Sequence, residues 1–130
     1  MKYDRTRDDS IEVLVHAFYE KVRLDAQLAP IFNEAIGKDW DAHISTMCDF
    51  WSTAMRVSAR YQGDILAAHR RLGGLHPALF GRWLELFEQT IEEHFADEPS
   101  AALRDRARKT ARNLQLALFH RQDEARGAVG

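Results

Sequence analysis

The chain has 130 residues, of which 45% are hydrophobic and 29% are charged. This length fits one domain, and the composition is that of a globular protein rather than a disordered chain. The 18 basic and 20 acidic residues give a net charge of −2, which excludes an electrostatic footprint for nucleic acid over the whole chain. We predict a single domain over 1–130, with a core of about 9–121 and a flexible tail over 122–130.

The chain contains one cysteine, Cys48, which excludes an intrachain disulfide and a CxxC redox or metal motif. The N-terminal residues, MKYDR, do not start an apolar run of the secretory kind. No stretch approaches the roughly 18 apolar residues of a membrane-spanning helix. These features predict a soluble cytoplasmic protein, with neither a membrane nor a nucleic acid as a partner.

Apolar residues recur at helical spacing along the chain, and the alternating pattern of strands is absent. The first predicted helix begins near Asp9, where Asp9 and Glu12 have the spacing of a capping box, and it ends at Asp25. The following segment, around Ile31 and Phe32, is predicted to be turn-like, with both apolar side chains buried.

A second long helix is predicted from about Lys38 to Ser58, and its apolar stripe includes His43. A short helix is expected from about Asp64 to Arg71, because a glycine precedes it and a glycine pair closes it. Pro77 suits the first turn of the next helix, and the last helix has an apolar stripe over 103–118. The chain is therefore predicted to be all-α.

The six histidines are the candidates for metal chemistry. None has a Glu three residues before it, so the Glu-x-x-His pairs of a di-iron bundle are absent. The His-Glu-x-x-His motif of zinc proteases and the glycine-rich phosphate loops are absent as well. A lone imidazole on a short helix, walled by aromatic residues, is instead what a helical protein needs to hold an iron macrocycle by one axial bond.

His69 is the histidine best placed for such a bond. Ile65 and Leu66 stand one turn before it and give it an apolar side. We expect a backbone carbonyl of the same helix to accept the second ring N–H. The two arginines at 70–71 favour the alternative that His69 is an exposed surface residue. His76 is a competing candidate, but it lies in a break before a proline.

Tyr19, His43 and Trp83 lie on the apolar faces of three different long helices. Each of them, taken alone, is most simply a core residue whose polar tip has found a partner. Three such side chains opposite a ligand-competent histidine indicate a pocket in which a small polar ligand would supply that partner.

Six short motifs follow one another along the chain: FY at 18–19, PIF at 30–32, WxxH at 40–43, FW at 50–51, LxxHRRL at 66–72 and RWLxLF at 82–87. In this combination, over about residues 9–121, the chain resembles a truncated haemoglobin of the third group. The resemblance implies a globin-like, two-over-two helical sandwich around haem b. The glycine pairs that follow the first helices in other truncated globins are missing, as expected for this group.

By this resemblance, His69 is the proximal iron ligand, and Tyr19, His43 and Trp83 face the small ligand on the distal side. Further contacts to the cofactor are expected from residues on the same helical faces and from an arginine that could pair with the haem propionates. These residues are Phe18, Phe32, Met47, Phe50, Trp51, Arg70, Leu72 and Phe80.

The implied function is reversible binding of O2, CO, NO or peroxide at a five-coordinate iron. Phenol and indole donors predict slow release of O2, which suits chemistry on O2, peroxide or NO better than transport. A peroxidase-like or NO-dioxygenase-like activity is one possibility, and it would need an external electron donor such as a reductase. The alternative is a cofactor-free helical interaction module. We expect a monomer or a weak dimer.

Overall fold

The computed structural model describes residues 2–120, which are helical apart from loops and one bridge between Tyr3 and Phe95. The predicted all-α class is confirmed. The predicted tail, 122–130, lies outside the described residues. In chain order the helices are α1 (Asp8–Leu24), α2 (Ala29–Ile36), α3 (Trp40–Ala54), α4 (Ile65–Arg70), α5 (Pro77–His94) and α6 (Asp97–Gln115), followed by a π-helical turn (Leu116–His120).

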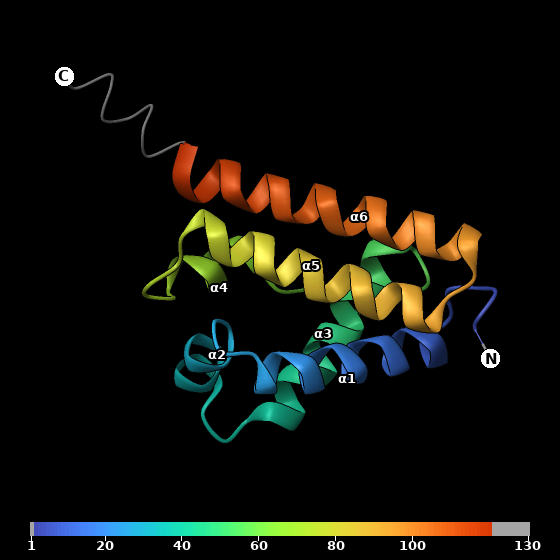
Figure 1. Cartoon of the computed structure of the whole chain (residues 1–130), viewed down its shortest axis with the longest axis horizontal. Helices are drawn as coiled ribbons and strands as arrows, with labels where there is room; N and C mark the ends of the chain where they lie inside the picture. Colours follow the sequence, from blue (N-terminus) through green and yellow to red (C-terminus); the bar gives the residue numbers. More distant parts are fainter. Residues whose placement is uncertain (1, 121–130) are drawn as a thin grey trace.

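The long helices form two pairs. Helix α1 packs on α3, while α5 and α6 lie side by side in antiparallel directions, and α1 joins the two pairs by packing on α5 (Figure 1). The shorter helices, α2 and α4, lie at the end of the molecule where α1 ends and α5 begins (Figure 1). Among residues 2–120, no helix is both long and apolar enough to cross a membrane.

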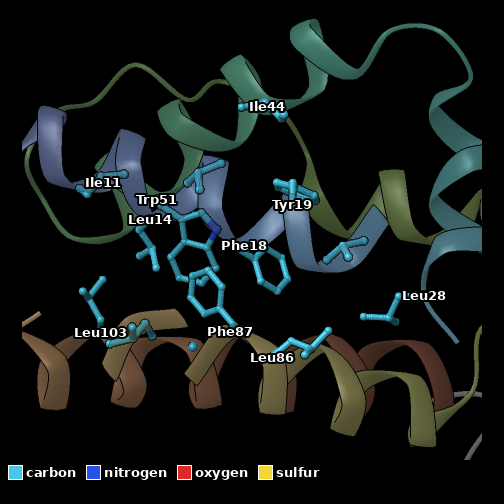
Figure 2. Close-up of a cluster of buried hydrophobic side chains, with 14 of the residues drawn as sticks. Ile11, Leu14, Phe18, Tyr19, Leu28, Ile44, Trp51, Leu86, Phe87 and Leu103 are labelled. Carbon is cyan, nitrogen blue, oxygen red and sulfur yellow. The ribbon is translucent and has the colours of Figure 1, made fainter. Parts of the chain in front are cut away.

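A cluster of large apolar side chains fills the space between the two pairs (Figure 2). Phe18 of α1, Trp51 of α3 and Phe87 of α5 meet there, and none of them is more than 3% exposed. The Phe87 ring meets the Phe18 ring edge-on at 4.9 Å and stacks on Trp51 at 4.7 Å. Burial of each such side chain contributes about 1.5–3 kcal/mol. This cluster therefore fixes how the three helices cross.

Helix α1 begins at Asp8, and the predicted capping box of Asp9 and Glu12 is wrong. The hydroxyl of Ser10, only 1% exposed, instead accepts a hydrogen bond from the Arg7 N–H at 2.8 Å. The Ser10 hydroxyl, at the third position of the helix, thus accepts from the backbone N–H of Arg7 at the N-cap. The predicted capping box gave this role to the carboxylate of Glu12.

The segment predicted to be turn-like is helix α2. Pro30 lies at its second position, where a missing N–H costs no helical hydrogen bond, and Gly37 ends it with a φ of +63°. Ile31 and Phe32 are half-buried rather than buried, because both line an open cavity. The proline therefore marks a helix start, and the turn prediction is wrong.

Helix α3 ends at Ala54, earlier than the predicted Ser58. Arg56, with a φ of +62°, takes the chain out of the helical direction two residues later. The following helix, α4, matches the predicted short helix closely. The Asp64 side chain caps α4 by accepting a hydrogen bond from the Ala67 N–H at 3.0 Å.

Asp25, at the end of α1, connects this helix to both α2 and α5. Its carboxylate accepts hydrogen bonds from two N–H groups of the α1–α2 turn and from the Arg82 guanidinium, whose Nε lies at 2.8 Å. Burial alone would raise the pKa of Asp25, but these hydrogen bonds hold it below the usual value. The ion pair between Arg82 and Asp25 thereby holds this part of α5, which includes residue 83, against the end of α1.

Candidate functional site

A largely apolar cavity of about 340 Å³ lies between α1, α2, α3, α4, α5 and α6. This volume is within the range of small-molecule and cofactor sites. Most of the site residues predicted from the sequence line it: Tyr19, Phe32, His43, Met47, Phe50, Trp51, His69, Leu72, Phe80 and Trp83. The structure therefore gathers side chains that are up to 64 residues apart in sequence around one space.

Two of the predicted contact residues, Phe18 and Arg70, are not among the residues that line the cavity. Phe18 is buried behind the wall, where its ring meets Tyr19 edge-on at 5.0 Å and Trp83 edge-on at 5.7 Å. Arg70 is exposed on α4. Phe18 therefore supports two lining residues from behind.

His69 reaches the cavity from α4, and its ring is fixed by its own helix. Its Nδ1 lies 2.7 Å from the Ile65 carbonyl oxygen, which confirms the predicted backbone partner. A carbonyl can only accept, so Nδ1 carries the proton and Nε2 keeps a free lone pair. The ring also stacks on Phe80 at 6.1 Å. The result is an oriented imidazole whose Nε2 is the nitrogen left to bind a metal.

His76, the competing candidate, is exposed at the N-cap of α5 and does not line the cavity. Its place in the fold follows from the break before Pro77. The structure thus supports the preference for His69.

Tyr19 of α1 and His43 of α3 form a hydrogen-bonded pair that lines the cavity. The His43 Nε2 lies 3.0 Å from the Tyr19 hydroxyl, and the two rings meet edge-on at 5.0 Å. Burial raises the pKa of Tyr19, with a smaller contribution from Cys48. Burial lowers the pKa of His43 to about 4, with a smaller contribution from His69. Both members of the pair are therefore uncharged at neutral pH.

Trp83 completes this side of the cavity from α5. Its ring stacks on Phe87 at 5.0 Å and on Trp51 at 6.1 Å, with interplanar angles of 14° and 20°. Because the stack continues into the buried cluster of Figure 2, the indole has little freedom to turn. Trp83 thus offers the cavity a fixed aromatic face and one N–H donor.

The cavity wall includes residues that sequence reasoning missed. Tyr61 lines it from the irregular segment between α3 and α4, where no periodic pattern indicates which way a side chain points. Thr110, Ala111 and Leu114 line it from α6. The apolar stripe of this helix was predicted, but the sequence does not show that part of it borders a cavity.

These residues fit a flat apolar cofactor whose metal needs one axial ligand. One imidazole nitrogen is free on α4, and the walls beside it are mainly aliphatic and aromatic. Apolar walls bury the faces of a macrocycle, and the single nitrogen supplies the bond that an iron porphyrin requires from the protein. The donor set is therefore that of a haem site.

Comparison with known proteins leads to the same family. No protein-family model matches the chain. The chain is 34% identical over 122 residues to the group 3 truncated hemoglobin ctb of Campylobacter jejuni, with 92% of this chain and 96% of that protein covered. A crystal structure of group III truncated hemoglobin from Campylobacter jejuni superposes with a TM-score of 0.87, at the same identity and coverage. The chain belongs to the group III truncated haemoglobins.

Proposed function

We propose that this globin binds haem b through the Nε2 of His69 and binds O2, CO, NO or peroxide on the side of Tyr19 and His43. The observation that carries the proposal is which ring nitrogen of each histidine already has a hydrogen-bond partner in the protein. The backbone of α4 occupies the Nδ1 of His69, whereas the Tyr19 hydroxyl occupies the Nε2 of His43. When bound, the haem iron supplies a coordination position for the small ligand.

The apolar wall would hold the cofactor by burial. Phe32, Met47, Phe50, Leu72 and Phe80 come from four separate segments around the cavity: α2, α3, the α4–α5 loop and α5. Each of these side chains gains contact area when a macrocycle fills the space, and such burial stabilises the complex in proportion to the apolar area. Two further contacts were predicted, at 51 and 70. Trp51 also lines the cavity. The Arg70 guanidinium is exposed and can pair with cofactor carboxylates.

The proton arrangement of Tyr19 and His43 decides what the distal side can donate. The His43 pKa of about 4 keeps the imidazole neutral, so Nε2 can carry a proton and donate it to the Tyr19 oxygen. The phenol proton is then free to point at a ligand. A hydrogen bond to a charged acceptor contributes about 1.5–3 kcal/mol, which slows ligand release about ten- to a hundredfold. The indole N–H of Trp83 is a second donor.

The absorption spectrum of the purified protein tests this proposal against a cofactor-free helical module. We expect a Soret band in the haem region, and we expect it to shift when CO is added to the reduced protein. A colourless protein that takes up no added haem would contradict the proposal and support the interaction module.

The same polar pair favours a second role, a peroxidase-like or NO-dioxygenase-like activity supplied with electrons by an external reductase. Tight retention of O2 is of little use for transport but allows time for a reaction. Mixing the O2-saturated protein with one equivalent of NO should produce nitrate within a single turnover. Release of unreacted O2 and NO would exclude the dioxygenase role.

A further inference from the structure

The irregular segment between α3 and α4, residues 55–64, brings one side chain into the cavity wall. Tyr61 lines the cavity, and its ring meets Phe50 edge-on at 5.1 Å, with an interplanar angle of 88°. Phe50 is itself a lining residue that meets Trp51 edge-on at 5.1 Å. Tyr61 therefore extends the aromatic wall from the buried core out to the edge of the cavity.

The Tyr61 ring lies close against the backbone of Gly63. A Cβ atom at Gly63 would lie 2.7 Å from the Tyr61 hydroxyl oxygen and 2.8 Å from the ring carbon that carries it. Such distances are too short for real contacts, so any side chain at this position would push the ring away. The absence of a side chain at Gly63 thus permits the observed position of Tyr61.

The residue before Tyr61 is held by two helices at once. The Arg60 guanidinium contacts both carboxylate oxygens of Asp8, at 2.7 and 3.2 Å, and its Nε donates to Asp49 at 2.9 Å. Asp8 is the first residue of α1, and Asp49 lies on α3. We refer to Asp8, Arg60 and Asp49 as the Arg60 clasp, because they join the segment to both helices.

Further hydrogen bonds hold the segment on either side of the clasp. The fully buried hydroxyl of Ser52 donates to Asp8 at 2.8 Å and lies 2.8 Å from the Ser58 hydroxyl. The Tyr61 N–H donates to the Thr53 hydroxyl at 3.0 Å. The chain on both sides of Arg60 is thus attached to the last turn of α3, which fixes the backbone from which the Tyr61 side chain extends.

We propose that Tyr61 is a further cofactor-contacting residue, and that the Arg60 clasp is a positioning device that keeps it against the cofactor. The proposal rests on the haem site proposed above. Arg60 joins the segment that carries Tyr61 to the first residue of α1 and to α3, so the direct effect of the network is to fix where this segment lies. Tyr61 slows the loss of haem, and Arg60 acts through Tyr61.

The rate of haem transfer to an excess of a haem-free acceptor globin tests this proposal in the holoprotein. Three variants displace Tyr61 in independent ways: Arg60→Gln opens the clasp, Gly63→Ala crowds the ring, and Tyr61→Ala removes it. We expect each to raise the haem dissociation rate about fivefold. The matched control is Arg108→Gln, which removes an ion pair with Glu88 between α6 and α5; neither residue lines the cavity, so the rate should be unchanged.

The double variant separates positioning from a general structural effect. If Arg60 acts through Tyr61, Arg60→Gln adds nothing to the rate of Tyr61→Ala, and hydrogen exchange at the Tyr61 amide accelerates in Arg60→Gln. Additive effects, or a wild-type rate in Tyr61→Ala, would overturn the proposal. Asp49→Asn replaces Arg60→Gln if the latter does not fold. A wild-type protein without a Soret band would overturn the proposed haem site as well, whereas unchanged rates in haem-bound variants would overturn only the clasp.

Discussion

Helices α3 and α4 each place a histidine in the cavity wall. The two histidines differ in the hydrogen-bond partner that orients the ring. On α4, His69 is held by a carbonyl of its own helix, four residues earlier. On α3, His43 is held by a hydroxyl from another helix, 24 residues away. The first contact is local and leaves Nε2 free, while the second depends on the packing of α1 against α3. The same side chain is thus suited to metal ligation in one place and to donor positioning in the other.

This difference predicts which changes affect which side. Substitutions on α4 should change the attachment of the cofactor, because the partner of the His69 Nδ1 lies within that helix. Substitutions on α1 should change the handling of the small ligand, because Tyr19 is the partner of His43 and the proposed hydrogen-bond donor to that ligand. The predictions below test that separation.

The largest effect is expected from His69→Gly, which removes the proposed axial ligand. We predict that this variant is purified with little or no haem, and that added imidazole restores a Soret band by filling the vacated space. His76→Asn is the matched control, because it removes the other histidine near α4 and places a preferred capping residue at the N-cap of α5, where His76 makes no side-chain cap hydrogen bond. Full haem content and an unchanged spectrum in His69→Gly would contradict the assignment.

The next effect is expected from Tyr19→Phe, which keeps the ring and removes the distal hydroxyl. The O2 dissociation rate, measured by stopped flow, should rise about ten- to a hundredfold, while haem content stays at the wild-type level. Tyr3→Phe serves as a control, since Tyr3 packs on Phe95 and does not line the cavity. An unchanged rate would remove Tyr19 from its role as a donor.

A smaller effect is expected in the pH dependence of stability. The pKa of His43 falls from 6.5 to about 4 on folding, so between these values the unfolded chain binds a proton that the folded chain does not. The free energy of unfolding should therefore rise with pH across this window, by about 2 kcal/mol after allowance for solvent screening.

Chemical denaturation of the wild-type and His43→Leu chains at pH 7, 5.5 and 4.5 measures this contribution. The leucine variant lacks the titrating group, so the difference between the two chains should shrink as the pH falls. A difference that is constant with pH would show that His43 titrates alike in the folded and unfolded states.

The smallest effect is expected from Phe80→Leu. This change keeps an apolar side chain but removes the ring that stacks on His69 at 6.1 Å. Loss of an aromatic contact of this kind costs about 0.5–1.5 kcal/mol, so haem dissociation should accelerate about two- to tenfold. Phe119→Leu loses the edge-on contact with Phe80 on its other side and should have no effect on the rate. Equal rates in all three proteins would show that α4 fixes His69 without help from α5.

Much of the fold could be predicted because apolar residues recur at helical spacing along each long amphipathic helix. The stripes of α1, α3, α5 and α6 were all visible in the sequence. Helix α2 was missed because a short apolar segment around Pro30 reads equally well as a turn, and only the packing of the segment decides between them. The end of α3 was set too late, since the left-handed backbone at Arg56 has no signal in the residue itself.

The site was predictable to the extent that its residues lie on periodic helices. Tyr19, His43 and Trp83 were recognised because polar tips on apolar faces are unusual. Tyr61 was missed because it lies on an irregular segment that has no period, and the ion pairs that join this segment to α1 and α3 link residues distant in sequence. Phe18 was expected to contact the cofactor, whereas the structure places it one layer behind; helical spacing does not distinguish a wall from its support.

We propose that the Nε2 of His69 is the only protein nitrogen bound to the haem iron in the reduced protein. A crystal structure of the reduced, haem-loaded protein tests it most directly. We predict continuous density between the iron and the Nε2 of His69, with Nδ1 still hydrogen-bonded to the Ile65 carbonyl. Iron bound to His43 or His76, or a cavity filled by protein side chains alone, would contradict the account.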